Sequence, residues 1–119
     1  MLSSADHLSQ AERFEAFLAT IPRNTPYPEW TIVIWFYISL HYVEAFLMTV
    51  APRERNHETR RLEIGRHQQT RAVAVPYQRL YKASREARYN GTPFIPRDLE
   101  IYEPLYLSIK AGMKGALRT

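Results

Sequence analysis

Residues 30–43 read WTIVIWFYISLHYV, a run that contains no Asp, Glu, Lys or Arg. With its flanks it predicts a helix from about Glu29 to Val50, ending where Pro52 removes a backbone donor. This helix is about long enough to cross a membrane. However, His41 and Glu44 lie inside it, and ionisable side chains are costly in a bilayer. We therefore predict a soluble core helix, buried nearly all round at the centre of a helical bundle.

Apolar side chains at helical spacing predict four further helices on either side of this one. The start of the first is open, because Ser3 and Ser9 each have an acidic residue at capping-box spacing. Gly65 is a weak point in the second of the four, and Pro104 predicts a kink or break near residues 101–103 of the last. The expected ranges are Ser4–Ile21, Arg55–Arg71, Pro76–Asn90 and Arg97–Leu117. We therefore expect one all-α domain, 1–119, folded as an up-and-down antiparallel bundle of about five helices.

Composition narrows the class of partner. The chain has no cysteine, which excludes disulfides and cysteine-ligated metals. Residues 53–88 hold ten basic and four acidic side chains, although the whole chain carries only +4. Such a segment favours a polyanionic or acidic partner, or is simply a solvated helix face. The first nine residues lack a signal-peptide pattern, so we expect a cytoplasmic protein with no membrane segment.

One candidate polar site lies on the central helix. Tyr37, His41 and Glu44 stand at i, i+4 and i+7, so they share one helix face. A histidine between a phenol and a carboxylate is a candidate acid/base group. The alternative is a buried histidine that its neighbours satisfy for structural reasons. His57, at the start of the basic segment, is grouped with these three residues.

The basic segment contains a second candidate site, made of Arg60, Arg61 and His67. An arginine that holds a phosphate beside a histidine acid/base is a workable ribonuclease site, and the alternative is a solvated charged face. In a continuous helix Arg61 and His67 lie off one face, whereas Arg60 is about 10 Å from His67 along the axis. The four histidines lack metal-ligand spacing, so we expect no metal and no cofactor.

Three pieces of the chain occur in an order and spacing that resembles the HEPN family of small helical-bundle proteins. The first two pieces match the family at Tyr37, His41, Ala45, Pro52, His57 and Arg60. The third is the stretch 84–89, SREARY, which resembles the arginine-rich end of a later family helix. The resemblance implies an antiparallel bundle, often dimeric, that works with RNA in toxin–antitoxin-like systems.

The resemblance is weaker at the family's nuclease motif, in which a polar residue usually follows the arginine. Here Leu62 follows Arg61. We therefore expect a non-catalytic, RNA-associated or partner-binding component of a toxin–antitoxin or defence-type system. The alternatives are a metal-independent endoribonuclease that uses Arg60 or Arg61 with His67, and a structural dimerisation module.

These expectations assign further residues and partners. The expected RNA contacts are Arg55, Arg60, Arg61, Arg66, Arg85 and Arg88. A homodimer is expected, with Trp35, Tyr42 and Phe46 as candidates for an apolar face left over after the core is filled. Many HEPN proteins are encoded beside a nucleotidyltransferase, so a protein of that type is the expected partner.

Overall fold

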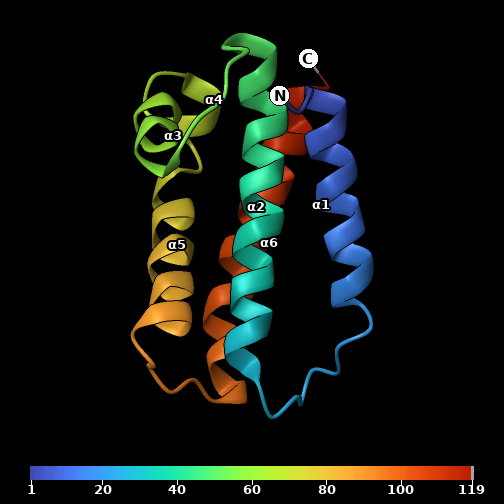
Figure 1. Ribbon diagram of the computed structural model, residues 1–119, viewed down its shortest axis with the longest axis vertical. Helices are drawn as coiled ribbons and strands as arrows, with labels where there is room; N and C mark the ends of the chain where they lie inside the picture. Colours follow the sequence, from blue (N-terminus) through green and yellow to red (C-terminus); the bar gives the residue numbers. More distant parts are fainter. Residues whose placement is uncertain (119) are drawn as a thin grey trace.

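The computed structural model describes residues 1–118, which form six α-helices, one 3-10 turn and no strand (Figure 1). The elements are α1 (Ser4–Leu18), α2 (Pro28–Val50), α3 (His57–Ile64), α4 (Gln68–Arg71), α5 (Ala74–Tyr89), η1 (Pro96–Asp98) and α6 (Leu99–Leu117). The all-helical prediction is confirmed. The predicted number of helices is not, because one expected helix is divided into α3 and α4.

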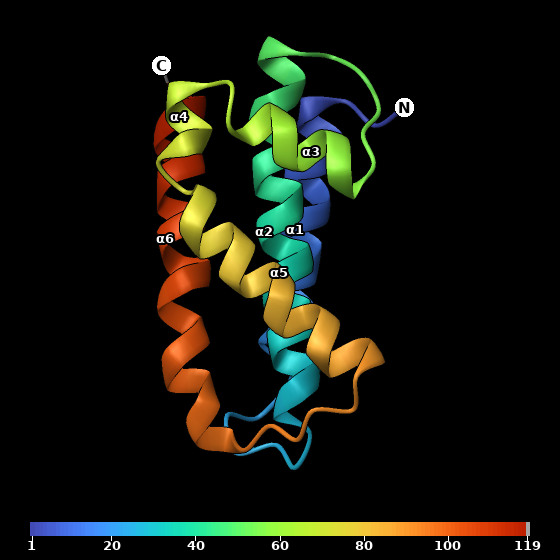
Figure 2. The ribbon, with the colours of Figure 1, turned by 90° about the vertical axis from the view of Figure 1, so that its left-hand side faces the viewer.

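Helix α2 is the centre of the molecule. Figure 1 shows α2 in front of α6, with α1 on one side and α5 on the other, and successive long helices run in alternate directions. Figure 2 shows that α5 crosses the bundle obliquely, while α3 and α4 lie near the end of the bundle that holds both chain termini. By length and composition α2 could cross a membrane, yet 72% of its most apolar 18-residue stretch is buried inside the protein. This burial matches the predicted core helix.

The first helix begins with a capping box. The Ser3 side chain accepts a hydrogen bond from the Asp6 backbone N–H, and the Asp6 carboxylate accepts one from the Ser3 N–H. Of the two starts that the sequence allowed, this reciprocal pair selects the earlier. The helix ends at Leu18, three residues before the predicted end, because the chain already turns ahead of Pro22.

The predicted continuous helix 55–71 is wrong. Helix α3 starts one residue after Asn56, which caps it with Thr59, and ends at Ile64, just before Gly65. A second short helix, α4, begins after His67. The buried Thr70 hydroxyl donates to the Ile64 carbonyl at 2.7 Å, so it satisfies an acceptor that the helix end leaves free. This bond holds the chain in its interrupted form at the predicted weak point.

Of the kink or break predicted near Pro104, the break is absent. Helix α6 is continuous from Leu99 to Leu117 with Pro104 inside it. Proline removes a single backbone hydrogen bond there, and the buried residues Tyr106, Ile109 and Met113 hold the following turns against the core. The packing of this apolar stripe outweighs the local cost of the proline.

A polar network joins three helices across the core. Glu15 of α1 accepts hydrogen bonds from the Tyr42 hydroxyl of α2 at 2.7 Å and from the Tyr106 hydroxyl of α6, and it pairs with Lys110 Nζ at 2.6 Å. Burial alone would raise the pKa of Glu15, but the hydrogen bonds from Lys110 and both tyrosines outweigh it and lower the pKa. The network therefore needs the ionised carboxylate.

The residues expected to form a dimer face are wrong. Trp35, Tyr42 and Phe46 are 2%, 0% and 4% exposed, and they fill the core between α2 and its neighbours. The open side of α2 instead presents four partly exposed residues, Trp30, Ile34, Tyr37 and His41. The residues chosen from the sequence fill the core, and the partly exposed side chains of α2 lie on a different face of the helix.

Two glycines in α6 offer a matched test of the packing of α6 against the chain near α5. A Cβ at Gly112 would meet the buried Val73 Cγ1 at 2.8 Å, whereas a Cβ at Gly115 meets nothing within 4 Å. We expect Gly115→Ala to stabilise the protein by about 0.5 kcal/mol through helix propensity. The free energy of unfolding of Gly112→Ala should be at least about 1 kcal/mol lower than that of Gly115→Ala, because the added Cβ overpacks against Val73. Urea denaturation measures both, and equal stability of the two variants would contradict this packing.

Candidate functional site

A buried carboxylate anchors the segment after the central helix. The Glu44 side chain is 4% exposed and binds Arg55 in a two-pronged contact, with Nε–Oε1 at 2.8 Å and Nη2–Oε2 at 3.0 Å. Arg60 Nε adds a third bond to Oε1 at 2.9 Å. The Arg55 side chain is completely buried and also donates to the Ala51 carbonyl. Glu44 therefore fixes the 51–56 connector and the first turn of α3 on α2.

The charges of this cluster determine its protonation. Burial would raise the pKa of Glu44, but hydrogen bonds from Arg55 and the positive charges of both arginines outweigh it and lower the pKa. Two guanidinium groups on one carboxylate leave a net positive charge. The folded protein therefore holds Glu44 ionised and paired with both arginines. At neutral pH Glu44 has no proton to exchange.

Two histidines adjoin the cluster. The Nδ1 atoms of His7 in α1 and His41 in α2 lie 3.0 Å apart, so one neutral ring donates to the other. Nε2 of His7 is 3.9 Å from Glu44 Oε2. Burial lowers the pKa of His41 to about 4, with repulsion from Arg60 and from His7 in its protonated form adding to the effect, and burial also lowers the pKa of His7. Both rings are therefore neutral at physiological pH.

The histidine pair separates two hollows in the surface. His7 borders a polar pocket of about 230 Å³, which Glu44 and Arg60 also line. His41 borders an apolar hollow of about 420 Å³ between α1 and α2, lined with it by Phe14, Phe17, Ile34 and Tyr37. The pair belongs to the wall between the hollows, where it joins α1 to α2.

The four residues of the predicted polar site do not form one site. His41 pairs with His7, and Glu44 pairs with the two arginines. Tyr37 lies one turn before His41 in α2 and accepts a hydrogen bond from Arg88 of α5 at 2.8 Å. His57 stacks on Tyr81 of α5, with ring centroids 3.6 Å apart. The shared helix face is real, but each side chain has a different partner.

The predicted catalytic residues are held apart. Arg60 binds Glu44, and Arg61 binds the exposed Glu58 at 2.6 Å. His67 Nε2 lies 2.9 Å from Glu63, a buried carboxylate that Arg53 and Arg66 also contact. The hydrogen bond from His67 outweighs burial and, with the arginines, lowers the pKa of Glu63 to about 2. The break after α3 thus does not bring His67 to either arginine.

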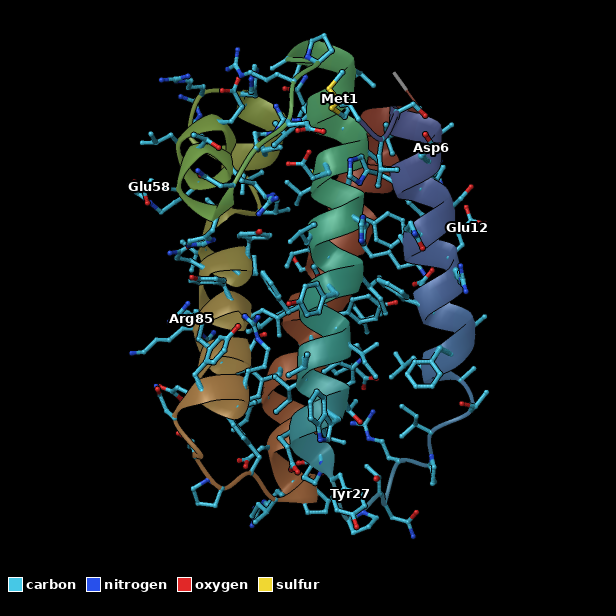
Figure 3. All side chains as sticks on the ribbon, in the orientation of Figure 1. Met1, Asp6, Glu12, Tyr27, Glu58 and Arg85 are labelled. Atoms are coloured by element: carbon cyan, nitrogen blue, oxygen red, sulfur yellow. The ribbon has the colours of Figure 1, made fainter. Side chains whose placement is uncertain are left out.

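An arginine–tyrosine cluster lies on α5 and reaches Tyr37 of α2, and its member Arg85 is labelled in Figure 3. Arg85 lies over the rings of Tyr81 and Tyr89, with its Cζ 6.0 and 5.1 Å from their centroids. Arg88 lies over Tyr89 and over Tyr37 of α2, at 4.9 and 5.4 Å. We call these five residues the α5 ladder. Neither arginine of the ladder has a carboxylate within ion-pair distance among residues 1–118.

The predicted RNA contacts therefore fall into two groups. Arg55 and Arg60 are buried or nearly so on Glu44, which corrects their assignment as surface contacts. Arg61 and Arg66 are exposed but already paired with carboxylates. Only Arg85 and Arg88, of the six, bind aromatic rings and leave their charge uncompensated within the described chain.

Sequence reasoning missed His7 and Tyr81, and it did not assign Tyr89 to a site. The contact of His7 joins residues 34 apart, and helical periodicity does not relate α1 to α2. Tyr81, Arg85 and Tyr89 stand at i, i+4 and i+8, a spacing that could have revealed the ladder. No cluster of three or more histidine, aspartate or glutamate side chains in residues 1–118 could hold a metal ion.

Comparisons with known proteins give no relative. No protein-family model, curated protein or solved structure matches this chain.

Replacement of Glu44 should show how strongly α3 depends on it. Glu44→Gln keeps the shape but removes the charge that Arg55 and Arg60 require, so we expect a loss of about 3 kcal/mol or more in the free energy of unfolding. The matched control is Glu58→Gln, which breaks an exposed pair and should change stability by less than about 0.5 kcal/mol. Urea denaturation at pH 7 compares them, and similar effects would refute the anchoring role of Glu44.

The histidine pair predicts a pH dependence. The pKa of His41 falls from 6.5 to about 4 on folding, so the unfolded chain binds more protons between these values. Stability is therefore complete above about pH 6.5 and declines as the pH falls toward 4, by about 2 kcal/mol at pH 5. His41→Gln should remove most of this decline in denaturation experiments at pH 5 and 7. An unchanged decline in the variant would show that other groups cause it.

Proposed function

We propose that this protein is a HEPN-type helical-bundle module that associates with RNA without cleaving it. The proposed setting is a cytoplasmic toxin–antitoxin or defence-type system with a nucleotidyltransferase-type partner protein. The sequence resemblance at residues 37–60 and 84–89 supports the family, and the arrangement of the long helices around α2 is compatible with an up-and-down bundle. The observation that carries the function is the α5 ladder, with its two arginines free of carboxylates.

The chemistry of the ladder suits RNA. Phosphate binding requires positive charge that internal ion pairs do not already neutralise. Helix α5 carries four basic side chains, Arg79, Lys82, Arg85 and Arg88, against the single acid Glu86. None of these four basic groups pairs with a carboxylate within the described chain. A protein partner would need an acidic face to match this helix, whereas RNA presents negative charge along its whole length.

The non-catalytic part of the proposal follows from the separation of the nuclease candidates. An acid/base must reach the phosphate that its arginine holds. Arg60, Arg61 and His67 are directed to three different carboxylates, Glu44, Glu58 and Glu63. Cleavage would require two of these pairs to open together.

RNA binding should depend on salt and on the ladder. We expect affinity for a short RNA to fall steeply between 50 and 200 mM salt because phosphate contacts release counterions. Arg85→Gln with Arg88→Gln should weaken binding about tenfold or more and reduce the salt slope by about 1 to 1.5. Arg61→Gln, in which the lost charge was already paired, is the control and should retain most of the affinity.

Fluorescence anisotropy measures these affinities, and gel analysis in chelator should recover the bound RNA intact. Absent or salt-independent binding would contradict the RNA association. Cleavage that His67→Ala abolishes would instead establish the endoribonuclease alternative. Dimerisation without any RNA binding would leave the structural-module alternative.

The homodimer remains part of the proposal, now on a different face. The apolar hollow between α1 and α2 is lined by Phe17, which is 55% exposed, and Trp30, one turn before the lining residue Ile34, is 57% exposed. We expect light scattering at micromolar concentration to give about twice the 14.0 kDa chain mass. Phe17→Asp should give a monomer, whereas Val75→Asp, at a 70% exposed site on α5, should remain dimeric. A monomeric parent protein, or a dimer unaffected by Phe17→Asp, would contradict this face.

A further inference from the structure

The α5 ladder is a series of planar groups with a regular rise. Tyr81, Arg85 and Tyr89 follow one another every four residues, which places them about 6 Å apart along the helix axis. His57 extends the series at one end by stacking on Tyr81 with only 12° between the ring planes. The groups thus form a continuous track from α3 to the end of α5.

The outer end of this track is open. Tyr89 is the last residue of α5 and is 64% exposed, although large aromatic side chains usually bury most of their area. The chain leaves the helix at Gly91, whose φ of 63° is a left-handed conformation suited to glycine. Arg85 beside it is also exposed. A planar ligand can therefore reach the ring of Tyr89 and the guanidinium of Arg85.

The second arginine of the ladder is fixed in place. Arg88 Nε donates to the Ser84 carbonyl at 3.3 Å, and its Nη1 donates to the hydroxyls of Tyr37 at 2.8 Å and Tyr89 at 3.3 Å. These bonds use Nε and Nη1, so they hold the plane of the guanidinium and orient Nη2. Such a preorganised arginine loses little side-chain entropy when it binds an anion.

We propose that the end of α5 binds an unpaired RNA base, stacked on Tyr89 and Arg85, with the adjoining phosphate on Nη2 of Arg88. The inference rests on the proposed RNA association and specifies its ligand. Bases stack on aromatic rings and on arginine planes, and this contact requires a base free of its own duplex. A site of this kind prefers single strands and tolerates many sequences, because every base has a π-face.

The test compares three fluorescein-labelled 12-nucleotide RNAs: a single-stranded oligoadenylate, an abasic chain with the same phosphates, and a duplex. Tyr89→Ala should weaken binding of the oligoadenylate about tenfold and leave binding of the abasic chain and the duplex unchanged. Tyr89→Phe keeps the ring and loses only the 3.3 Å hydrogen bond from Arg88, so it should bind nearly as well as the parent protein. Tyr27→Ala removes a tyrosine of similar exposure, 62%, and is the matched control.

The outcomes separate this inference from the proposed function. If no RNA binds the parent protein, the proposed function fails and the inference fails with it. If RNA binds through Arg85 and Arg88 but Tyr89→Ala has no effect, or if the abasic chain binds as well as the oligoadenylate, the inference alone is overturned. Thermal unfolding by circular dichroism checks that Tyr89→Ala is folded, and Tyr89→Leu replaces it if it is not.

Discussion

The rest of the structure depends on one buried ion cluster, in which Glu44 holds Arg55 and Arg60. A carboxylate in the most apolar helix of the chain is tolerable only because it is fully paired. By binding Arg55, it brings the connector back along α2, and by binding Arg60 it fixes the first turn of α3. His57 is then placed over Tyr81 of α5. A single charge on α2 thereby positions the segment that links α2 to α5.

The ion pairs of residues 53–66 explain why much of the basic charge of this chain is not free to bind a ligand. All five arginines between residues 53 and 66 pair with three glutamates, Glu44, Glu58 and Glu63. These ion pairs hold α3 and its connector on the bundle. Within residues 53–88, the basic side chains without a carboxylate partner in the described chain are Arg71 and the four on α5, where tyrosine rings contact Arg85 and Arg88. Net charge alone would have suggested a basic patch over the whole of this segment, whereas the ion pairs occupy half of its ten basic groups.

Helix positions followed largely from local sequence, because apolar spacing and capping residues act over a few residues. The division between α3 and α4 did not, since Gly65 only weakens a helix and the Thr70 hydroxyl completes the interruption. Pairings across the fold were out of reach. Glu44 and Arg60 are 16 residues apart, and Tyr37 and Arg88 are 51 apart. Helical periodicity correctly placed Tyr37, His41 and Glu44 on one face, but it could not show that each turns to a different neighbour.

The division of the arginines into structural and ligand-binding groups can be measured directly. In a protein labelled with ¹⁵N at arginine, each Nε–H signal reports the surroundings of one guanidinium during titration with a short single-stranded RNA. The signals of Arg85 and Arg88 should shift with RNA concentration, whereas those of Arg55 and Arg60 should keep their positions on Glu44. Shifts at Arg55 and Arg60 with none at Arg85 and Arg88 would contradict this division and move the binding surface to α3.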